Sequence, residues 1–252
     1  MDRDAFALLR DAEAHHWWFR ARRELADRMI RHLRLPAGAR LLDAGCGVGG
    51  MLPVLAQHGA VHAFEPDAEA CREASSRGIG AVVPGGMPTG VPFADGPGFD
   101  LVTLFDVLEH LEDPVASLRA LRERLVPGGR LLLTVPAQPW LWGPHDAHHR
   151  HYRRYDKPTL RAHLEAAGLT VDYLTGTNVL LLPLAILQRF RERWFGYRVD
   201  DLHPSQWLGA LLHRVWTAEF RWVPPRVLPT GLSLLAVAHR PATPDPDVAP
   251  HG

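Results

Sequence analysis

The chain has 252 residues, of which 46% are hydrophobic and 22% are charged, and its 28 basic residues balance its 28 acidic residues. This composition is typical of a globular protein with a sizeable core, and the zero net charge excludes a strong overall field toward nucleic acid or an anionic membrane. Cys46 and Cys71 are the only cysteines, which excludes a disulfide scaffold and a four-cysteine zinc site.

The first residues are polar and charged where a signal peptide needs an apolar core, and no apolar run approaches the roughly 18 residues of a membrane span. We therefore expect a cytoplasmic protein without a transmembrane segment. Lys157 is the only lysine, which argues against a phosphate-loop lysine and Schiff-base chemistry. Residues 241–252 are rich in proline and aspartate and predict a disordered tail.

The chain opens with a predicted helical cap over residues 1–35. Residues 39–45 then form a short apolar run typical of a buried strand, and a glycine-rich loop follows directly. A helix over 51–59 and a second strand over 60–67 complete a strand, loop, helix, strand unit.

The alternation of short strands and amphipathic helices continues to residue 137. The further elements are a helix at 68–78, a strand at 79–85, a strand that begins at 99 and passes into a helix start, a helix at 114–129 and a strand at 130–137. Such alternation predicts a doubly wound, mostly parallel α/β sheet covered on both faces. Ligands of such sheets bind outside the carboxyl ends of the strands.

The second half of the chain is less regular. A helix at 157–168 and strands at 169–179 and 232–240 are predicted, with a tryptophan-containing segment between the two strands. We expect residues 180–228 to form a helical insertion, because a structureless loop of that length is improbable in a compact domain. The main domain then spans 36–240.

The stretch "LLDAGCGVGG", which starts at residue 41, contains Gly45, Gly47 and Gly50 at the spacing of a dinucleotide-binding loop. Asp43 precedes these glycines, and its carboxylate would oppose a doubly charged pyrophosphate at a helix N-terminus. It suits a ligand with a cationic end, such as S-adenosylmethionine. Glu65, at the end of the second strand, is placed to accept hydrogen bonds from the ribose diol of either cofactor.

Four stretches together resemble class I S-adenosylmethionine-dependent methyltransferases. "LLDAGCGVGG" and "FEPD" are similar to the first two motifs of that family, and "VPFADGPGFDLVTLFDVLEHLEDP" and "LVPGGRLLLTVP" to its fourth and fifth strand motifs. "HHWWFRARREL" and "WGPHDAHHRHYRRYDKPTLRAHLEAAGL" resemble a bacterial subgroup, of type 11 or 23, that opens with a His-Trp-Trp-Phe segment. The resemblance implies a Rossmann-like seven-stranded sheet whose last strand is antiparallel.

The resemblance also implies a cofactor site. Asp43, Gly45 and Gly47 match the positions that hold the methionine end of the cofactor, and Glu65 matches the acid that binds the ribose. Cys46, in the same loop, is also expected among the cofactor-binding residues, as a small packing residue of the turn rather than a nucleophile.

Two further positions complete the expected cofactor site. Asp106 matches a position beside the amino and carboxylate groups of the cofactor. Gly86 stands where the family usually has an acid that meets the adenine amino group, so base recognition would fall to backbone atoms and to packing by Met87.

His110 and His151 are the candidate catalytic residues, because an imidazole titrates near neutral pH and can take a proton from an acceptor. His110 follows the fourth strand; the alternative is that it and Glu109 cap or brace the start of the next helix. The resemblance places His151, Tyr152 and Arg154 on an active-site wall; the alternative is a structural loop.

Several residues around His151 have side chains that could bind a metal: His145, Asp146, His148 and His149. We expect no metal, because such residues are common in polar loops and no helical two-histidine motif is present.

His16, Trp17 and Phe19 are expected to form a lid over the cofactor mouth, with simple packing as the alternative. The apolar and arginine-rich run at 178–195 is too short to span a bilayer. It could contact a membrane surface; the alternatives are a homodimer interface and a buried insertion helix.

Together these features predict a methyltransferase that uses S-adenosylmethionine to methylate a small-molecule acceptor, with oxygen favoured over nitrogen or carbon. The acceptor classes left open are secondary metabolites, lipid-linked molecules and saccharides. The alternative functions are an NAD-dependent oxidoreductase and a non-catalytic cofactor-binding subunit.

Overall fold

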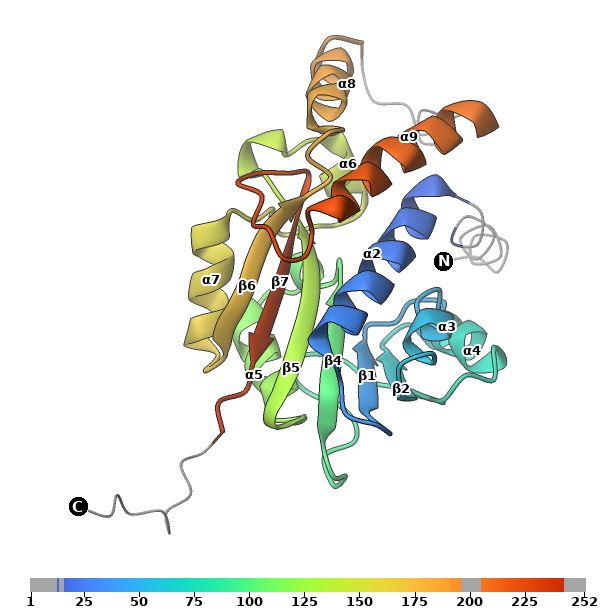
Figure 1. Cartoon of the computed structure of the whole chain (residues 1–252), viewed down its shortest axis with the longest axis vertical. Coiled ribbons are helices and arrows are strands. Elements are labelled where there is room, and N and C mark those ends of the chain that lie inside the picture. The colour runs from blue at the N-terminus through green and yellow to red at the C-terminus, as the bar shows by residue number, and fades with distance from the viewer. Residues whose placement is uncertain (1–12, 14–15, 196–204, 243–252) are drawn as a thin grey trace, which may run out of the picture.

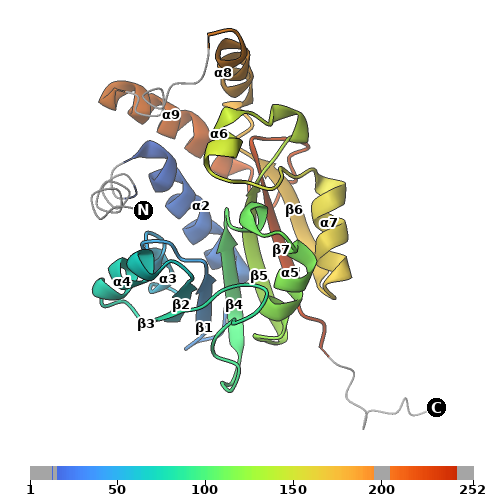
Figure 2. The ribbon, with the colours of Figure 1, turned by 180° about the vertical axis from the view of Figure 1, so that it is seen from behind.

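The computed structural model describes residue 13 and residues 16–195 and 205–242. Most of the predicted tail at 241–252 and the start of the predicted cap lie outside these residues. The described elements form one seven-stranded sheet with helices on both faces (Figures 1 and 2).

The strands lie in the order β3-β2-β1-β4-β5-β7-β6. Their bounds are β1 (Arg40–Ala44), β2 (Ala60–Glu65), β3 (Ala81–Pro84), β4 (Phe99–Phe105), β5 (Leu125–Pro136), β6 (Thr170–Thr177) and β7 (Ser233–His239). The first five pair in parallel, and β7 is antiparallel to both of its neighbours, β5 and β6. The predicted doubly wound fold with an antiparallel last strand is confirmed.

Helices cover both faces of this sheet. They are α2 (Trp17–Leu33), α3 (Leu52–Leu55), α4 (Ala68–Ser76), α5 (Pro114–Arg122), α6 (Pro144–His148), α7 (Lys157–Ala166), α8 (Leu182–Phe195) and α9 (Gln206–Ala218), with short 3-10 turns η1 (Leu108–His110), η2 (Pro139–Leu141) and η4 (Glu219–Arg221).

Leu41 and Leu42 illustrate how both faces of the sheet are packed, because successive strand residues point to opposite faces. Leu42 packs in the cluster that contains α5 and α7, and Leu41 in the one that contains α2, α3 and α9.

Aspartate caps fix where three of the helices begin. Asp67, Asp113 and Asp156 accept hydrogen bonds from backbone amides in the first turns of α4, α5 and α7, at 3.0, 2.9 and 2.8 Å. Each bond satisfies an amide that has no partner within the helix. The cap of α5 is therefore Asp113 rather than Glu109 or His110, and the alternative that these two residues brace the start of the helix stays open.

The helix predicted over 114–129 is shorter than expected. It ends at Arg122, and Leu125 is the first residue of β5, paired with Phe99 of β4. Leu125 is buried through strand pairing, so its helical spacing in the sequence was misleading. The helix predicted at 51–59 is likewise reduced to the single turn of α3.

The predicted helical cap is part of the core rather than a separate layer. α2 lies against α9 (Figure 1), and the Trp18 ring contacts that of Trp216 with 4.6 Å between centroids. Trp216 is only 2% exposed. The N-terminal helix and the helical insertion therefore stabilise each other.

The predicted insertion is helical, but α8 projects from the body of the molecule (Figures 1 and 2). Its side chains include Leu187, Phe190 and Trp194, which are 66%, 59% and 80% exposed. The alternative of a buried insertion helix is therefore wrong for α8. Contact with a membrane surface and a homodimer interface stay predictions. Among the described helices, none has the length and apolar character to cross a membrane.

Candidate active site

The glycine loop begins where β1 ends, beside the carboxyl end of β2. The amides of Gly45 and Cys46 both donate to the carbonyl of Phe64, at 2.9 and 3.1 Å. Gly45 and Gly47 have φ values of +71° and +56°, which L residues with side chains rarely adopt. A Cβ on Gly47 would meet no atom within 4 Å, so this side of the loop is open.

Glu65 ends β2 and holds the glycine loop. Its Oε2 accepts from the amide of Gly47 at 3.0 Å, and its Oε1 accepts from the amide of Asp67 at 3.1 Å. Burial raises the pKa of the Glu65 carboxyl, and these two hydrogen bonds oppose the shift. The carboxylate is thus held at the loop edge with lone pairs left to accept from a diol.

Asp43 lies in β1 and is 2% exposed. Its Oδ1 accepts a hydrogen bond from Thr103 Oγ1 of β4 at 2.7 Å. Burial raises the pKa of Asp43 to about 6, although the Thr103 hydrogen bond and the charge of Arg22 oppose the shift. A carboxylate in so dry a place favours a cationic neighbour.

Asp106 follows β4 and forms an ion pair that the sequence did not indicate. Its Oδ2 lies 3.1 Å from Nη2 of Arg22 in α2, and its Oδ1 accepts from Thr134 Oγ1 at 3.0 Å. Arg22 Nη2 also donates to the carbonyl of Phe105 at 3.2 Å. A cation therefore stands beside an anion at the end of β4, next to the glycine loop, which meets this segment at Val107.

These groups fit S-adenosylmethionine better than a dinucleotide. The loop edge presents carboxylates of Glu65 and Asp106, and the Asp43 carboxylate is buried in β1 just before the loop. Together they repel a pyrophosphate but attract a sulfonium and an ammonium. Arg22 suits the single carboxylate of the amino acid, and the open side of Gly47 leaves room for it.

Met87 and Gly86 give less information. Met87 is half-buried and packs against the same cluster as Phe64 and Val107. A Cβ on Gly86 would have Pro66 and Thr89 as its nearest neighbours, each at 3.9 Å. The space next to this glycine is therefore not occupied by another side chain. The role of Met87 at the adenine stays a prediction.

Glu13 lies over the glycine loop, which was not expected from the sequence. Its carboxylate would clash with any Cβ on Gly50, and its Oε2 lies 3.8 Å from Nη2 of Arg77. Burial raises the pKa of Glu13, with the charges of Arg77 and Arg22 opposing the shift. A residue shortly before α2 therefore covers part of the loop.

The predicted lid residues lie in the first turn of α2. His16 caps the helix, since its Nδ1 accepts from the amide of Trp18 at 3.3 Å. The Trp17 ring contacts that of Trp216 in α9, with centroids 6.3 Å apart, and the Phe19 ring lies 5.8 Å from the guanidinium carbon of Arg22. Trp17 thus has a packing role, whereas Phe19 contacts the arginine beside the glycine loop. A lid function stays a prediction for all three.

The two candidate catalytic histidines lie together. The rings of His110 and His151 are nearly perpendicular, with 4.6 Å between centroids. Burial and the charges of His151 and His149 lower the pKa of His110 to about 4. His110 is therefore neutral at physiological pH and can accept a hydrogen bond from a hydroxyl.

Glu109 adjoins these histidines and is 1% exposed. Burial and the nearby Asp106 raise its pKa well above the ordinary value. One donor atom each from Glu109, His110 and His151 lie within 4.8 Å of one another, the one such grouping in the described part of the chain. This spacing would allow a cation to bind, which was not expected from the sequence. Glu109 was absent from the predicted site because an acid next to a histidine is common in helix starts.

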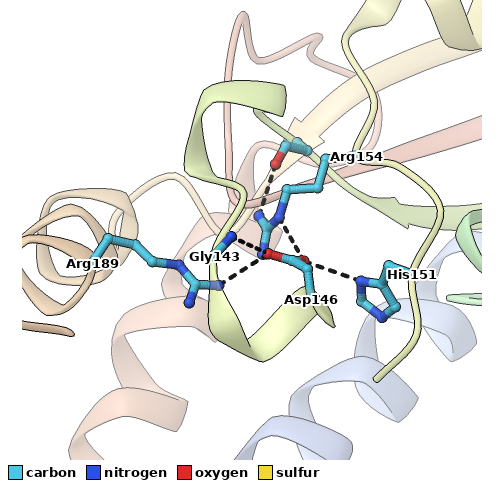
Figure 3. A network of polar contacts seen from close by, with 6 residues as sticks. Gly143, Asp146, His151, Arg154 and Arg189 are labelled. Carbon is cyan, nitrogen blue, oxygen red and sulfur yellow. Dashed lines mark hydrogen bonds and ion pairs between the residues drawn. The ribbon is translucent and has the colours of Figure 1, made fainter. Parts of the chain in front are cut away.

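The predicted active-site wall is organised around Asp146, which is fully buried (Figure 3). Arg154 donates through Nε to Asp146 at 2.8 Å and through Nη1 to the carbonyl of Ala137 at 2.9 Å. Arg154 therefore braces the wall, with its side chain 9% exposed. Tyr152 is 56% exposed, and its amide donates to the carbonyl of Glu109 at 2.8 Å.

Comparisons with known proteins show the family to which this chain is similar. The family model described as "Methyltransferase domain" matches residues 15–174. The ubiquinone biosynthesis O-methyltransferase of Xanthomonas axonopodis pv. citri is 31% identical over 201 residues, which cover 69% of this chain and 82% of that protein. The protein of the same name from Azotobacter vinelandii is 26% identical over 210 residues and covers 66% and 83%.

Solved structures show the same fold at low sequence identity. The methyltransferase bound to the Trm112 methyltransferase activator of Haloferax volcanii has a TM-score of 0.60 at 18% identity, over 95% of this chain and 96% of its own. Phosphoethanolamine N-methyltransferase 2 of Haemonchus contortus, in complex with S-adenosyl-L-methionine, has a TM-score of 0.55 at 18% identity, over 86% and 52%.

Proposed function

Because this chain belongs to the class I S-adenosylmethionine-dependent methyltransferases, we propose that it transfers the methyl group of this cofactor to an oxygen of a small-molecule acceptor. The observation that carries this proposal is the pair of rings of His110 and His151, with 4.6 Å between centroids, which can take a proton from a hydroxyl or an amine; the names of the similar O-methyltransferases then favour oxygen. A hydroxyl acceptor must lose a proton during transfer, and a neutral imidazole can take it.

The chain's own residues supply the cofactor site. The open side of the loop at Gly47 receives the methionine end, and Glu65 accepts from the ribose hydroxyls. Arg22 binds the carboxylate, while Asp106 and the buried Asp43 favour the positive charges. When bound, S-adenosylmethionine supplies an electrophilic methyl group. What remains for the protein is to align the acceptor in line with it and to exclude water.

The methyl acceptor would bind beside η1 and beside the segment after β5 that contains His151, Tyr152 and Arg154. Part of the His110 residue contacts solvent there, although surrounding groups desolvate its imidazole. His151 contacts it from the wall, and the exposed Tyr152 follows His151 in the chain. The nicotinamide alternative is disfavoured by the carboxylates around the loop, which suit a cation and repel a pyrophosphate.

A panel of acceptors tests this proposal. The purified chain is incubated with S-adenosylmethionine and matched molecules that differ only in the acceptor group, such as phenol, catechol, aniline and benzoate. We expect release of S-adenosylhomocysteine to depend on a hydroxyl compound. Release with aniline and with none of the oxygen compounds would contradict the choice of oxygen. Tight binding of NADH without binding of S-adenosylhomocysteine would contradict the cofactor site.

A further inference from the structure

Exposed apolar side chains gather at one end of the molecule. Of the twelve large apolar side chains that are exposed in the described chain, ten belong to residues 138–155, 180–195 and 205–218. Figures 1 and 2 both place the helices of these segments, α6, α8 and α9, at the same end. We call the exposed surface of these three segments the apolar end. Such a concentration of apolar surface is typical of an interaction site.

Two polar contacts join the three segments. Oδ2 of Asp146 lies 3.4 Å from Nη2 of Arg189, which connects α6 to α8 (Figure 3). The amide of Leu180 donates to Oε1 of Glu219 at 2.6 Å, which connects the start of α8 to the end of α9. The apolar end is therefore one connected surface rather than three separate segments.

The solvent-facing side of α8 is apolar. Its large apolar side chains are spaced by three or four residues, which puts them on one face, and each is at least half exposed: Leu184, Leu187, Phe190 and Trp194. Arg191 lies on the same face, four residues after Leu187, and is exposed. A surface helix normally turns its apolar side to the core. The reversed arrangement of α8 indicates a partner that takes up apolar side chains.

The apolar end is also basic, although the whole chain has no net charge. Residues 138–155 and 180–218 contain eight arginines and four acids. Among the side chains that the structure describes in these stretches, Asp146 is the one acid and is fully buried, whereas Arg150, Arg191 and Arg214 are exposed. The charge of this end therefore complements an anionic surface.

We propose that the apolar end docks on the surface of an anionic lipid bilayer, with α8 in the headgroup region and Leu187, Phe190 and Trp194 directed into the acyl chains. Aromatic and aliphatic side chains combined with arginines are typical of helices that lie in a membrane interface. A second copy of the chain fits less well, because two basic ends repel each other. A nucleic acid would pair with the arginines but leave the leucines exposed. The contact is peripheral, since no described helix can cross a membrane.

Vesicle flotation with the full chain tests the proposal. The vesicles consist of phosphatidylcholine alone or of phosphatidylcholine mixed with the anionic lipid phosphatidylglycerol. We expect the protein to float with the mixed vesicles, to float less with phosphatidylcholine alone, and to dissociate as the salt concentration rises, because salt screens surface charges. Failure to float with either vesicle would overturn the proposal, and equal, salt-independent binding to both would overturn the anionic specificity.

Matched substitutions test whether α8 makes the contact. Phe190 and Val227 are 59% and 57% exposed, but Val227 lies outside the apolar end. We expect F190E to weaken binding to the mixed vesicles by about 10-fold or more, because the buried ring area is lost and a negative charge is added, and V227E to bind as the wild type does. Wild-type binding by F190E would overturn the assignment of α8.

A second pair of variants tests the charge. We expect R214Q in α9 to weaken binding to the mixed vesicles by about 5-fold, with little effect on phosphatidylcholine vesicles. R161Q is the control, since Arg161 is 49% exposed but lies in α7, outside the apolar end. Equal effects of R214Q and R161Q would mean that binding reflects overall charge rather than this surface.

Two further measurements separate this proposal from its alternatives. Light scattering without vesicles detects self-association, and a dimer that F190E dissociates, in a protein that binds no vesicle, would assign the apolar end to a second copy. The Kd for S-adenosylhomocysteine should be the same in F190E and the wild type, because α8 lies outside the cofactor site. If the wild type does not bind S-adenosylhomocysteine, the proposed function fails, and the flotation result still decides the membrane contact.

Discussion

Arg22 of α2 and Asp106 at the end of β4 form an ion pair, with 3.1 Å between Nη2 and Oδ2, although the two residues lie far apart in the sequence. The pair joins the N-terminal helix to the loop after β4 at the place where the glycine loop turns. This contact brings α2 to the proposed cofactor site as well as into the core.

The first prediction concerns this arginine. We expect R22M to weaken binding of S-adenosylhomocysteine by about 10- to 100-fold, because a charged hydrogen bond contributes roughly 1.5–3 kcal/mol. Calorimetric titration measures the Kd. The control is R28M, since Arg28 lies in the same helix and donates to the carbonyl of Val223 at 2.8 Å, away from the glycine loop. Equal binding by R22M and the wild type would remove Arg22 from the site.

Gly47 provides a test that separates folding from binding. We expect G47A to lose about 1 kcal/mol in the free energy of unfolding, because alanine resists a positive φ, and also to lose cofactor affinity. Gly78 is a matched control, with φ +66° and no atom within 4 Å of where a Cβ would lie. G78A should show a similar loss of stability in urea unfolding, with unchanged affinity. If both variants bind alike, the open side of Gly47 does not face the cofactor.

The raised pKa of Asp43, about 6, predicts a pH dependence of stability. A carboxyl whose pKa is higher in the folded state stabilises the fold at low pH, and that stability is lost as the pH rises through the folded-state value. From about pH 4 to pH 6, the free energy of unfolding should therefore fall by roughly 2 kcal/mol more in the wild type than in D43N. Urea unfolding without cofactor measures this difference.

Cofactor binding should show the opposite trend at Asp43. Ionisation of this carboxyl favours a cationic ligand, so the affinity of the wild type for S-adenosylmethionine, which carries a sulfonium and an ammonium, should rise over the same pH range. D43N should show little of this rise. Parallel pH profiles of the two proteins would mean that Asp43 does not sense the ligand charge.

Trp216 tests whether the insertion and the N-terminal helix form one core. Since Trp216 is 2% exposed and Trp222 is 39% exposed, we expect W216A to lose about 3–5 kcal/mol in the free energy of unfolding and W222A much less. Urea unfolding monitored by circular dichroism checks both. A small effect of W216A would indicate that α9 is not needed to hold α2 on the sheet.

The sequence could predict the parts of the site that depend on local order. The glycine loop, Glu65 and Asp106 each lie where a strand ends, and the strands were recognisable from short apolar runs. Parallel strands bring their carboxyl ends to one edge, so these residues had to meet. The antiparallel last strand came from the family resemblance rather than from any pattern in β7.

Other parts could not be predicted because they depend on contacts between distant segments. Arg22 is one of several arginines in its helix, and only the packing of α2 on the sheet determines that this arginine is the one that contacts Asp106. In the sequence, Asp146 is one polar loop residue among several histidines. Its burial and its ion pairs with Arg154 and Arg189 depend on the tertiary packing of the segment after β5. Leu125 was misplaced because four-residue spacing from Leu121 also occurs by chance before a strand.

The central claim, transfer of a methyl group to oxygen, is tested most directly by identifying the methylated atom. The protein is incubated with a small-molecule extract and S-adenosylmethionine labelled with ¹³C in its methyl group, and the product is examined by ¹H–¹³C correlation spectroscopy. We expect a new methyl signal at the carbon shift of a methoxy group, absent from the control without enzyme. A signal at the shift of an N-methyl or C-methyl group, with no methoxy signal, would contradict the account.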